Sequence, residues 1–390
     1  MKYVIIRCED RATVGNQLAP LLEGAKTSHL QQLAQAGAAG VIRPRALRRM
    51  INQFDVHRAL LGVRPDDISL RPGRCDAASI NRTLASGETA WCCQLVTQHD
   101  GQIIDPTAGN IPTKESELLI QVLDESLGSE ARQWDVGAGP HHLLIANDPA
   151  LTFEDHAAIP PPELLVGQKW RRHLPKGSAG DALRQVMEQA MTLLESHPVN
   201  RVRIDLGENP ANMLWLWGPG HAESQTTFVE RAGLSAAVVS SNFLLQGLAC
   251  LLGLTCEEMP SGFDADTLRQ ISERVGALLE RHDLVYVHLV VDSLDAVERQ
   301  CAMERIDQLL LRPMTDTVSQ RGPWRLLTAI DDRSSPLVPF VAIGTGLPQQ
   351  PIATLALQSF TESPLKFGED GEALAWLTRN EAGARAATIR

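Results

Sequence analysis

Three acidic residues stand at or just beyond the ends of apolar runs, where a protein can hold a divalent cation. Glu9 lies shortly after KYVII, Asp292 directly follows LVYVHLVV, and Asp331 directly follows WRLLTAI. Such runs predict buried strands, and Mg²⁺ and Mn²⁺ accept carboxylate oxygens as ligands. The three residues are therefore candidate ligands of one ion. The alternative is that they are polar residues at strand ends that cap the helices which follow.

Proton transfer is the second chemistry that the residue types allow. Asp55 and His57 lie close together in MINQFDVHRALLG, and a carboxylate near an imidazole can act as a general acid or base. The alternative is a solvated turn of helix. His288 is the last histidine of the chain, so the final hundred residues supply no imidazole to a metal site.

Tryptophans mark two candidate binding regions. Trp215 and Trp217 lie in WLWGPG, where they could line a ligand cleft; the alternative is that both belong to the core of a buried strand. Trp170 lies in the loop 148–176, which is long for a compact domain. Tryptophan is a frequent interface anchor, so we expect this loop to meet a protein partner. Packing of the loop on its own domain is the alternative.

The elements that must position these residues alternate between strand and helix. The apolar runs that predict strands are 2–6, 211–217, 236–241, 284–291, 324–330 and 339–344. Helical periodicity between them, as at 242–253 and 294–311, predicts an α/β fold in which helices cover both faces of a doubly wound, mostly parallel sheet.

The middle of the chain has a different pattern. Residues 88–145 carry alternating strands around a helix at 114–127, and a long helix at 180–196 follows the proline-rich loop. We therefore expect an inserted α+β domain at 85–205, within a core built from 1–84 and 206–390.

Composition limits the classes of partner. The formal net charge of −11 disfavours binding to nucleic acid or to an anionic membrane surface. The seven cysteines include no CxxC pair, and no stretch approaches 18 apolar residues. The sequence is typical of a cytoplasmic protein with reduced thiols.

Three stretches together resemble one family. They are KTSHLQQLAQAGAAGV (26–41), QLVTQHDGQIIDPTAGNIPT (94–113), and HPVNR (197–201) followed by NPANMLWLWGPG (209–220). The chain is similar in them to the archaeal-type, cofactor-independent phosphoglycerate mutases of the alkaline phosphatase superfamily. The resemblance implies an alkaline-phosphatase-like core with an inserted lid domain, and isomerase activity that uses two divalent metals and a phosphoryl-accepting serine.

The catalytic positions that the resemblance implies are largely replaced. The first-strand aspartate falls at Glu9, and Asp292 and Asp331 fall at further ligand positions without the histidines that should accompany them. The serine falls near Gln53, and no Ser or Thr lies between Ser28 and Ser69.

The basic residues expected to hold the substrate are replaced as well. They fall at Cys92, Asn110 and His141, none of which offers the fork of donors that suits phosphate and carboxylate oxygens.

The sequence thus predicts a phosphoglycerate-mutase-like protein that has lost catalysis and acts as a binding or complex-forming subunit. Its expected partner is a protein, either an active relative or a second copy of itself, and no cofactor is expected. The alternative is an active metal-dependent mutase or phosphatase-type phosphotransferase with a reduced site that holds a single Mg²⁺ or Mn²⁺ ion.

Overall fold

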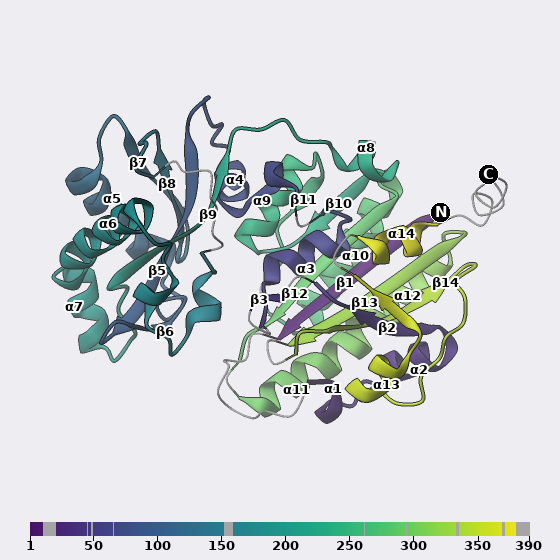
Figure 1. The fold of residues 1–390 in the computed structure, drawn as a ribbon. Helices are drawn as coiled ribbons and strands as arrows, with labels where there is room; N and C mark the ends of the chain where they lie inside the picture. The colour runs from purple at the N-terminus through teal and green to yellow at the C-terminus, as the bar shows by residue number, and fades with distance from the viewer. Residues whose placement is uncertain are drawn as a thin grey trace. The chain divides into compact units, whose positions relative to one another are not determined.

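The computed structural model divides the chain into two compact units. It describes all residues except 11–20, 45, 48–49, 65, 152–158, 261, 294, 333–334, 369–370 and 380–390. Unit 1 consists of Met1–Asp66, Thr226–Asn242 and Leu252–Arg390, and unit 2 consists of Asp67–Gln225 and Phe243–Leu251. Each unit is drawn in Figure 1.

The unit boundaries differ from those expected from the sequence. Residues 67–84 and 206–225, which we expected in the core, belong to unit 2, and so does the helix 243–251. The reason is strand pairing: the segment expected as a core strand at 211–217 pairs instead with the long first strand of unit 2. A pattern of apolar residues reveals a buried strand but not the sheet that it joins.

Unit 1 is built on an eight-stranded sheet in the order β11-β10-β12-β1-β13-β14-β2-β15. Its strands are β1 (Lys2–Asp10), β2 (Ala38–Ile42), β10 (Ala236–Val239), β11 (Thr255–Glu257), β12 (Leu284–Val291), β13 (Trp324–Asp332), β14 (Val338–Gly344) and β15 (Leu365–Phe367). Only β14 runs antiparallel to its neighbours. The short strands β3 (Ala46–Leu47) and β4 (Met50–Ile51) pair separately.

Helices cover both faces of this sheet, as the strand sequences require. They are α1 (Leu21–Gly24), α2 (Ser28–Ala36), α3 (Gln53–Leu60), α8 (Phe228–Ala232), α10 (Ala265–Arg281), α11 (Ala296–Arg305), the π-helix η4 (Ile306–Leu311), α12 (Arg312–Ser319), α13 (Leu357–Glu362) and α14 (Glu372–Thr378). The predicted doubly wound, mostly parallel α/β sheet is confirmed.

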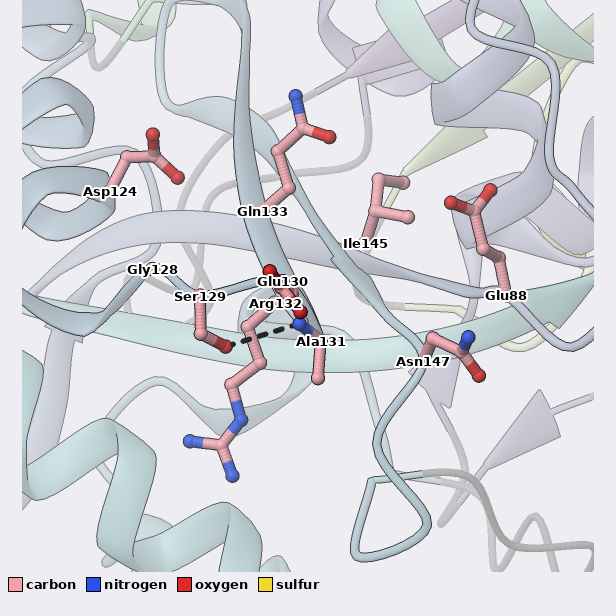
Figure 2. A pocket seen from close by; sticks show the side chains of 10 residues that line it. All are labelled: Glu88, Asp124, Gly128, Ser129, Glu130, Ala131, Arg132, Gln133, Ile145 and Asn147. Atoms are coloured by element: carbon pink, nitrogen blue, oxygen red, sulfur yellow. Dashed lines mark hydrogen bonds between the residues drawn. The ribbon is translucent and has the colours of Figure 1, made fainter.

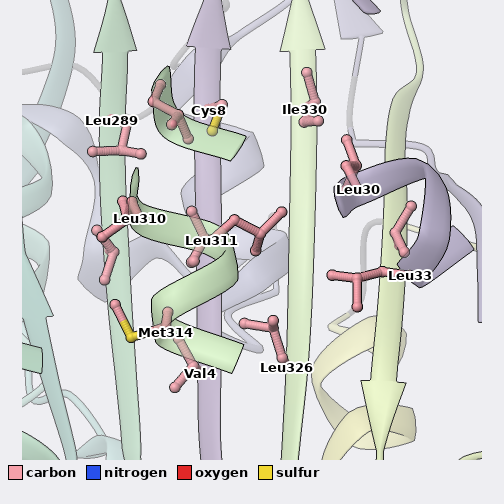
Figure 3. Close-up of a cluster of buried hydrophobic side chains, with 14 of the residues drawn as sticks. Val4, Cys8, Leu30, Leu33, Leu289, Leu310, Leu311, Met314, Leu326 and Ile330 are labelled. Carbon is pink, nitrogen blue, oxygen red and sulfur yellow. The ribbon is translucent and has the colours of Figure 1, made fainter. Parts of the chain in front are cut away.

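The larger core of unit 1 lies on one face of the sheet. Alternate residues of β1, namely Val4, Ile6 and Cys8, point to this face and pack with α2, α10, α11, η4 and α12. Figure 3 shows Leu310 and Leu311 of η4 over β1 and its neighbours. The other residues of β1 therefore point to the opposite face, towards α3 and α14.

Unit 2 contains an antiparallel sheet of five strands. They are β5 (Thr89–His99), β6 (Gln102–Asp105), β7 (Arg132–Ala138), β8 (His141–Ala146) and β9 (Met213–His221), and β5 pairs with β6, β8 and β9. The helices of the unit are η1 (Ile68–Leu70), α4 (Pro72–Ser79), α5 (Thr113–Leu127), η2 (Pro162–Leu165), η3 (Trp170–His173), α6 (Ser178–Glu195), α7 (Pro198–Asp205) and α9 (Phe243–Leu251). This is the additional α+β unit that the sequence predicts.

The WLWGPG motif has a structural role in unit 2. Gly218 has φ +55°, and a Cβ there would lie 2.7 Å from Cβ of Pro72 in α4. A Cβ at Gly220 would lie 2.8 Å from the backbone nitrogen of Arg74 in the same helix. The two glycines therefore let β9 approach the backbone of α4 closely.

In the part of the chain that the structure describes, no helix combines the length and the apolar character needed to cross a membrane.

We expect Gly218→Ala to lower the free energy of unfolding by about 1–3 kcal/mol more than Gly207→Ala, because only the first also crowds a neighbour. Gly207 is a matched control: it has φ +77° in the same unit, and nothing lies within 4 Å of its added Cβ. Urea denaturation followed by circular dichroism measures both. Equal losses of unfolding free energy in the two variants would show that α4 shifts to accommodate the added methyl group without loss of stability.

Candidate functional site

Strand register gathers a polar cluster at the carboxyl ends of the central strands of unit 1. Arg7 is paired with His288 of β12, and Glu9 with Asp331 of β13. Tyr286 is paired with Ile5, so its side chain lies on the same face. These polar residues continue the face that is apolar nearer the start of β1, and α3 covers them.

Arg7 is the centre of this cluster and is fully buried. Its Nε and Nη2 donate to the two carboxylate oxygens of Asp331 at 2.9 and 2.8 Å. Its Nη1 donates to the carbonyl oxygen of Gln53 at 3.2 Å, and its Nη2 donates to Oε1 of the same residue. Nη1 also lies 2.9 Å from Nε2 of His57. A guanidinium has five N–H donors, so every one meets an acceptor from the protein itself.

Charge keeps Arg7 protonated in this buried place. Burial by itself lowers the pKa of Arg7, but Asp331 and then Glu9 outweigh it and hold the pKa above its usual range. Glu9 Oε2 lies 3.7 Å from Nη2 of Arg7. The cluster therefore contains one cation between two carboxylates.

His57 lies between Arg7 and Tyr286. Nη1 of Arg7 lies 2.9 Å from Nε2 of His57 and 3.1 Å from its Nδ1, and Arg7 can only donate to them. The hydroxyl of Tyr286 lies 2.7 Å from Nδ1. Both His57 and Asp55 are buried, so the solvated turn considered above is wrong, and His57 belongs to the network around Arg7.

His288 links Glu9 to the neighbouring strand. Its Nε2 lies 3.0 Å from Oε2 of Glu9, and its Nδ1 lies 3.2 Å from Oγ of Ser240, just beyond β10. Its ring meets that of His57 edge to face, with centroids 4.5 Å apart. Glu9, His57 and His288 have ligand atoms within 4.8 Å of one another and are the one group of three potential metal ligands that the described residues form.

Comparison with known proteins identifies the family of the chain. Residues 34–200 match the family described as 2,3-bisphosphoglycerate-independent phosphoglycerate mutase. The mutase of that name from Methanosarcina acetivorans is 31% identical over 289 residues, which are 73% of this chain and 71% of that protein. The chain belongs to this family. The mutase from Methanosarcina mazei is 28% identical over 95% of this chain and 96% of its own length.

Solved structures agree on the fold. The cofactor-independent phosphoglycerate mutase from Thermoplasma acidophilum has a TM-score of 0.57 and 22% identity, over 97% of this chain and 100% of that chain. A protein from Pyrococcus horikoshii has a TM-score of 0.69 and 17% identity, over 97% and 98%. At these identities the likeness concerns the fold.

The residues present do not fit the two divalent metals that the mutase family implies. The described chain offers one three-donor group, and the guanidinium of Arg7 is bonded within it. Of the three carboxylates predicted as ligands, Glu9 and Asp331 lie side by side, but both oxygens of Asp331 accept from Arg7. Asp292 is exposed to solvent and lies outside the group.

The predicted tryptophan sites are core positions of unit 2. Trp215 and Trp217 are buried, and their Nε1 atoms donate to the carbonyl oxygen of Pro160 and to Oε1 of Gln94. Trp170 is fully buried and packs edge to face against Trp215, with ring centroids 6.5 Å apart. The prediction of Trp170 as a surface anchor is wrong, because its apolar ring fills the core instead. Part of its loop, 152–158, lies outside the described residues.

Sequence reasoning missed Arg7, Tyr286 and Ser240. A charged residue inside the apolar start of β1 was the available signal for Arg7, since buried arginines require partners. Period-two alternation places Tyr286 on the same face as His288. Nothing local marks Ser240, which joins the site only through the pairing of β10 with β12.

A polar hollow of about 340 Å³ lies in unit 2 and is drawn in Figure 2. Three acidic residues line it, Glu88, Asp124 and Glu130, together with a single arginine, Arg132. Arg132 is already paired with Asp148, 2.8 Å from its Nε. The hollow therefore presents no uncommitted guanidinium to a phosphate or a carboxylate.

The carboxyl group of Asp76, on α4 of unit 2, is also buried. Burial raises the pKa of Asp76 to about 7, and a hydrogen bond with Cys92 offsets part of this rise. Oδ1 of Asp76 has no hydrogen-bond partner. The carboxyl group on α4 is therefore stable mainly in its neutral form.

Asp331→Asn should lower the free energy of unfolding by about 3–5 kcal/mol, because it removes the charge that balances a buried guanidinium. Asp66→Asn is the matched control: Asp66 pairs with Arg64 at 3.1 Å, but both side chains are more than 60% exposed. We expect it to change stability by less than about 1 kcal/mol. Chemical denaturation compares the two, and equal effects would contradict the central role of the Arg7–Asp331 pair.

Asp76 should make stability depend on pH. Its folded pKa of about 7 exceeds the ordinary value of 3.8, so the folded chain keeps a proton that the unfolded chain releases. The free energy of unfolding therefore falls as pH rises from about 4 to 7, by up to about 1.4 kcal/mol per unit.

Asp76→Asn removes this titration. The variant should gain stability relative to the parent between pH 4.5 and 7.5, by about 3 kcal/mol. Denaturation curves at the two pH values measure the difference, in which all other titrations cancel. A constant difference would show that Asp76 is ionised in the folded protein.

Proposed function

We propose that this chain is a non-catalytic member of the phosphoglycerate mutase family that acts as a binding or complex-forming subunit. The observation that supports it most is the saturation of Arg7. All five of its N–H donors are engaged by Asp331, Gln53 and His57. A phosphoryl group entering this edge of the sheet would find a cation that has no donor left for it.

The nucleophile position supports the same proposal. Near the start of α3, where the resemblance puts the phosphoryl-accepting serine, Gln53 accepts an N–H of Arg7 through its side-chain oxygen. An amide is a poor nucleophile, and Asn52 beside it caps the helix by accepting from the backbone nitrogen of Phe54. The side-chain oxygen of each residue is thus engaged in a structural bond.

The substrate-side positions also favour loss of catalysis. Cys92 is buried in the core of unit 2, and burial raises the pKa of its thiol. Asn110 occupies a turn with φ +53°, and His141 stacks on Phe243. None of the three can supply the guanidinium fork that a phosphorylated acid requires.

The second candidate is an active, metal-dependent mutase or phosphatase-type phosphotransferase. It is favoured by the relatives, which are named as mutases, and by the three potential ligands Glu9, His57 and His288. In this candidate a single Mg²⁺ or Mn²⁺ ion would serve where the family uses two.

The binding half of the proposal concerns a protein partner, either an active relative or a second copy of this chain. A retained fold without phosphoryl-transfer chemistry is the motive for it. Affinity purification from the native host and sedimentation of the purified chain test the two partners, and a stable 1:1 assembly is the expected result. A chain that stays monomeric and co-purifies with nothing would contradict this half.

The purified chain should not interconvert 3-phosphoglycerate and 2-phosphoglycerate when Mn²⁺ is supplied. A coupled assay measures this, and turnover of about 1 per second, at the low end of ordinary enzymes, would overturn the proposal. Glu9→Gln is the control for any trace rate: an activity that survives the substitution comes from a contaminating mutase.

A further inference from the structure

The charges of the polar cluster suggest a role for Arg7 that goes beyond the loss of catalysis and rests on the proposed function. Glu9 and Asp331 contribute two negative charges, and Arg7 contributes one positive charge. Without the guanidinium the same buried residues would carry a charge of −2, which a divalent cation would balance.

We propose that Arg7 is an internal cation that closes a site for one transition-metal ion, formed by Glu9, His57 and His288. The three side chains are buried and come from β1, α3 and β12. Their ligand atoms already lie within 4.8 Å of one another. One carboxylate oxygen with two imidazole nitrogens suits Zn²⁺ or Co²⁺ better than Mg²⁺.

The neighbours of both histidines fit this role. The Nδ1 of His57 lies 2.7 Å from the hydroxyl of Tyr286, and Nη1 of Arg7 lies 2.9 Å from Nε2 of the same ring. Nε2 of His288 donates to Glu9, and its Nδ1 faces the hydroxyl of Ser240. A hydroxyl can donate or accept, so His288 can move its proton to Nδ1 and free Nε2. Such outer partners orient the histidine ligands of metal sites.

Arg7 blocks the site in two ways. Its Nη1 lies within 3.1 Å of both ring nitrogens of His57, where a metal ion would have to bind. Its positive charge lies 3.7 Å from Oε2 of Glu9, where it repels a second cation. Asp331 fixes the guanidinium there through both of its oxygens. The parent chain therefore needs no metal to hold these strands together.

The test is metal titration of the parent and of Arg7→Met, by calorimetry with Zn²⁺ and by the visible absorption of Co²⁺. Methionine keeps the aliphatic length but removes the charge and the donors. We expect Arg7→Met to bind one equivalent at least about 100-fold more tightly than the parent. Arg7→Lys keeps the charge and should bind as weakly as the parent.

The double variant Arg7→Met, His288→Ala should lose the increased metal affinity of Arg7→Met. That loss would show that the ion binds to the donors that include His288. Tight stoichiometric binding by the parent, or no gain in Arg7→Met, would overturn the proposal. If Arg7→Met is unfolded because Asp331 is left unpaired, Asp331→Asn is added. Should that variant also be unfolded without metal, refolding on addition of Zn²⁺ supports the proposal, and failure to refold counts against it.

These outcomes are separate from the assay of catalysis. Turnover of phosphoglycerate by the parent would refute the proposed function, whatever the metal titrations give. Equal metal binding by the parent and Arg7→Met would refute the proposal that Arg7 closes the metal site. It would not by itself refute the proposed loss of catalysis.

Discussion

A buried guanidinium must find an acceptor for each of its N–H groups, and in this protein that requirement organises the carboxyl edge of the central sheet. Arg7 donates to the carboxylate of Asp331 on β13. On α3 it donates to the backbone and side-chain oxygens of Gln53, and it contacts the imidazole of His57. The Arg7–Asp331 pair has a defined geometry as well as opposite charges, because the two carboxylate oxygens of Asp331 match the planar fork of the guanidinium. These bonds join α3 to this face of the sheet.

The same constraint bears on the chemistry that the strand ends can perform. A bound ion can take ligands from a substrate, whereas a side-chain cation with all donors engaged cannot. The sheet, its helices and the additional antiparallel unit are those of the family, and the solved relatives share this fold. In this chain a positive charge at the strand ends, that of Arg7, is covalently part of β1.

Other polar bonds inside the protein are also structural. The carboxylate of Asp307, on the π-helix η4, accepts the backbone N–H groups of His29 and Leu30 and so completes the start of α2. In the HPVNR motif, His197 caps α7, and Asn200 bonds Leu194 and Ala211. A motif that marks a family can thus serve its fold.

The sequence by itself determined the alternation of strands and helices, the mostly parallel sheet and the family, because periodicity and short motifs are local properties. It also determined that no serine or threonine lies between Ser28 and Ser69 and that no histidine follows His288. Tertiary structure alone decided which sheet β9 joins, that Trp170 is buried, and that Arg7 meets Asp331 from 324 positions away. The physical reason is register: a shift of one residue between β1 and β13 would turn these side chains to opposite faces, and nothing local in either strand specifies that alignment.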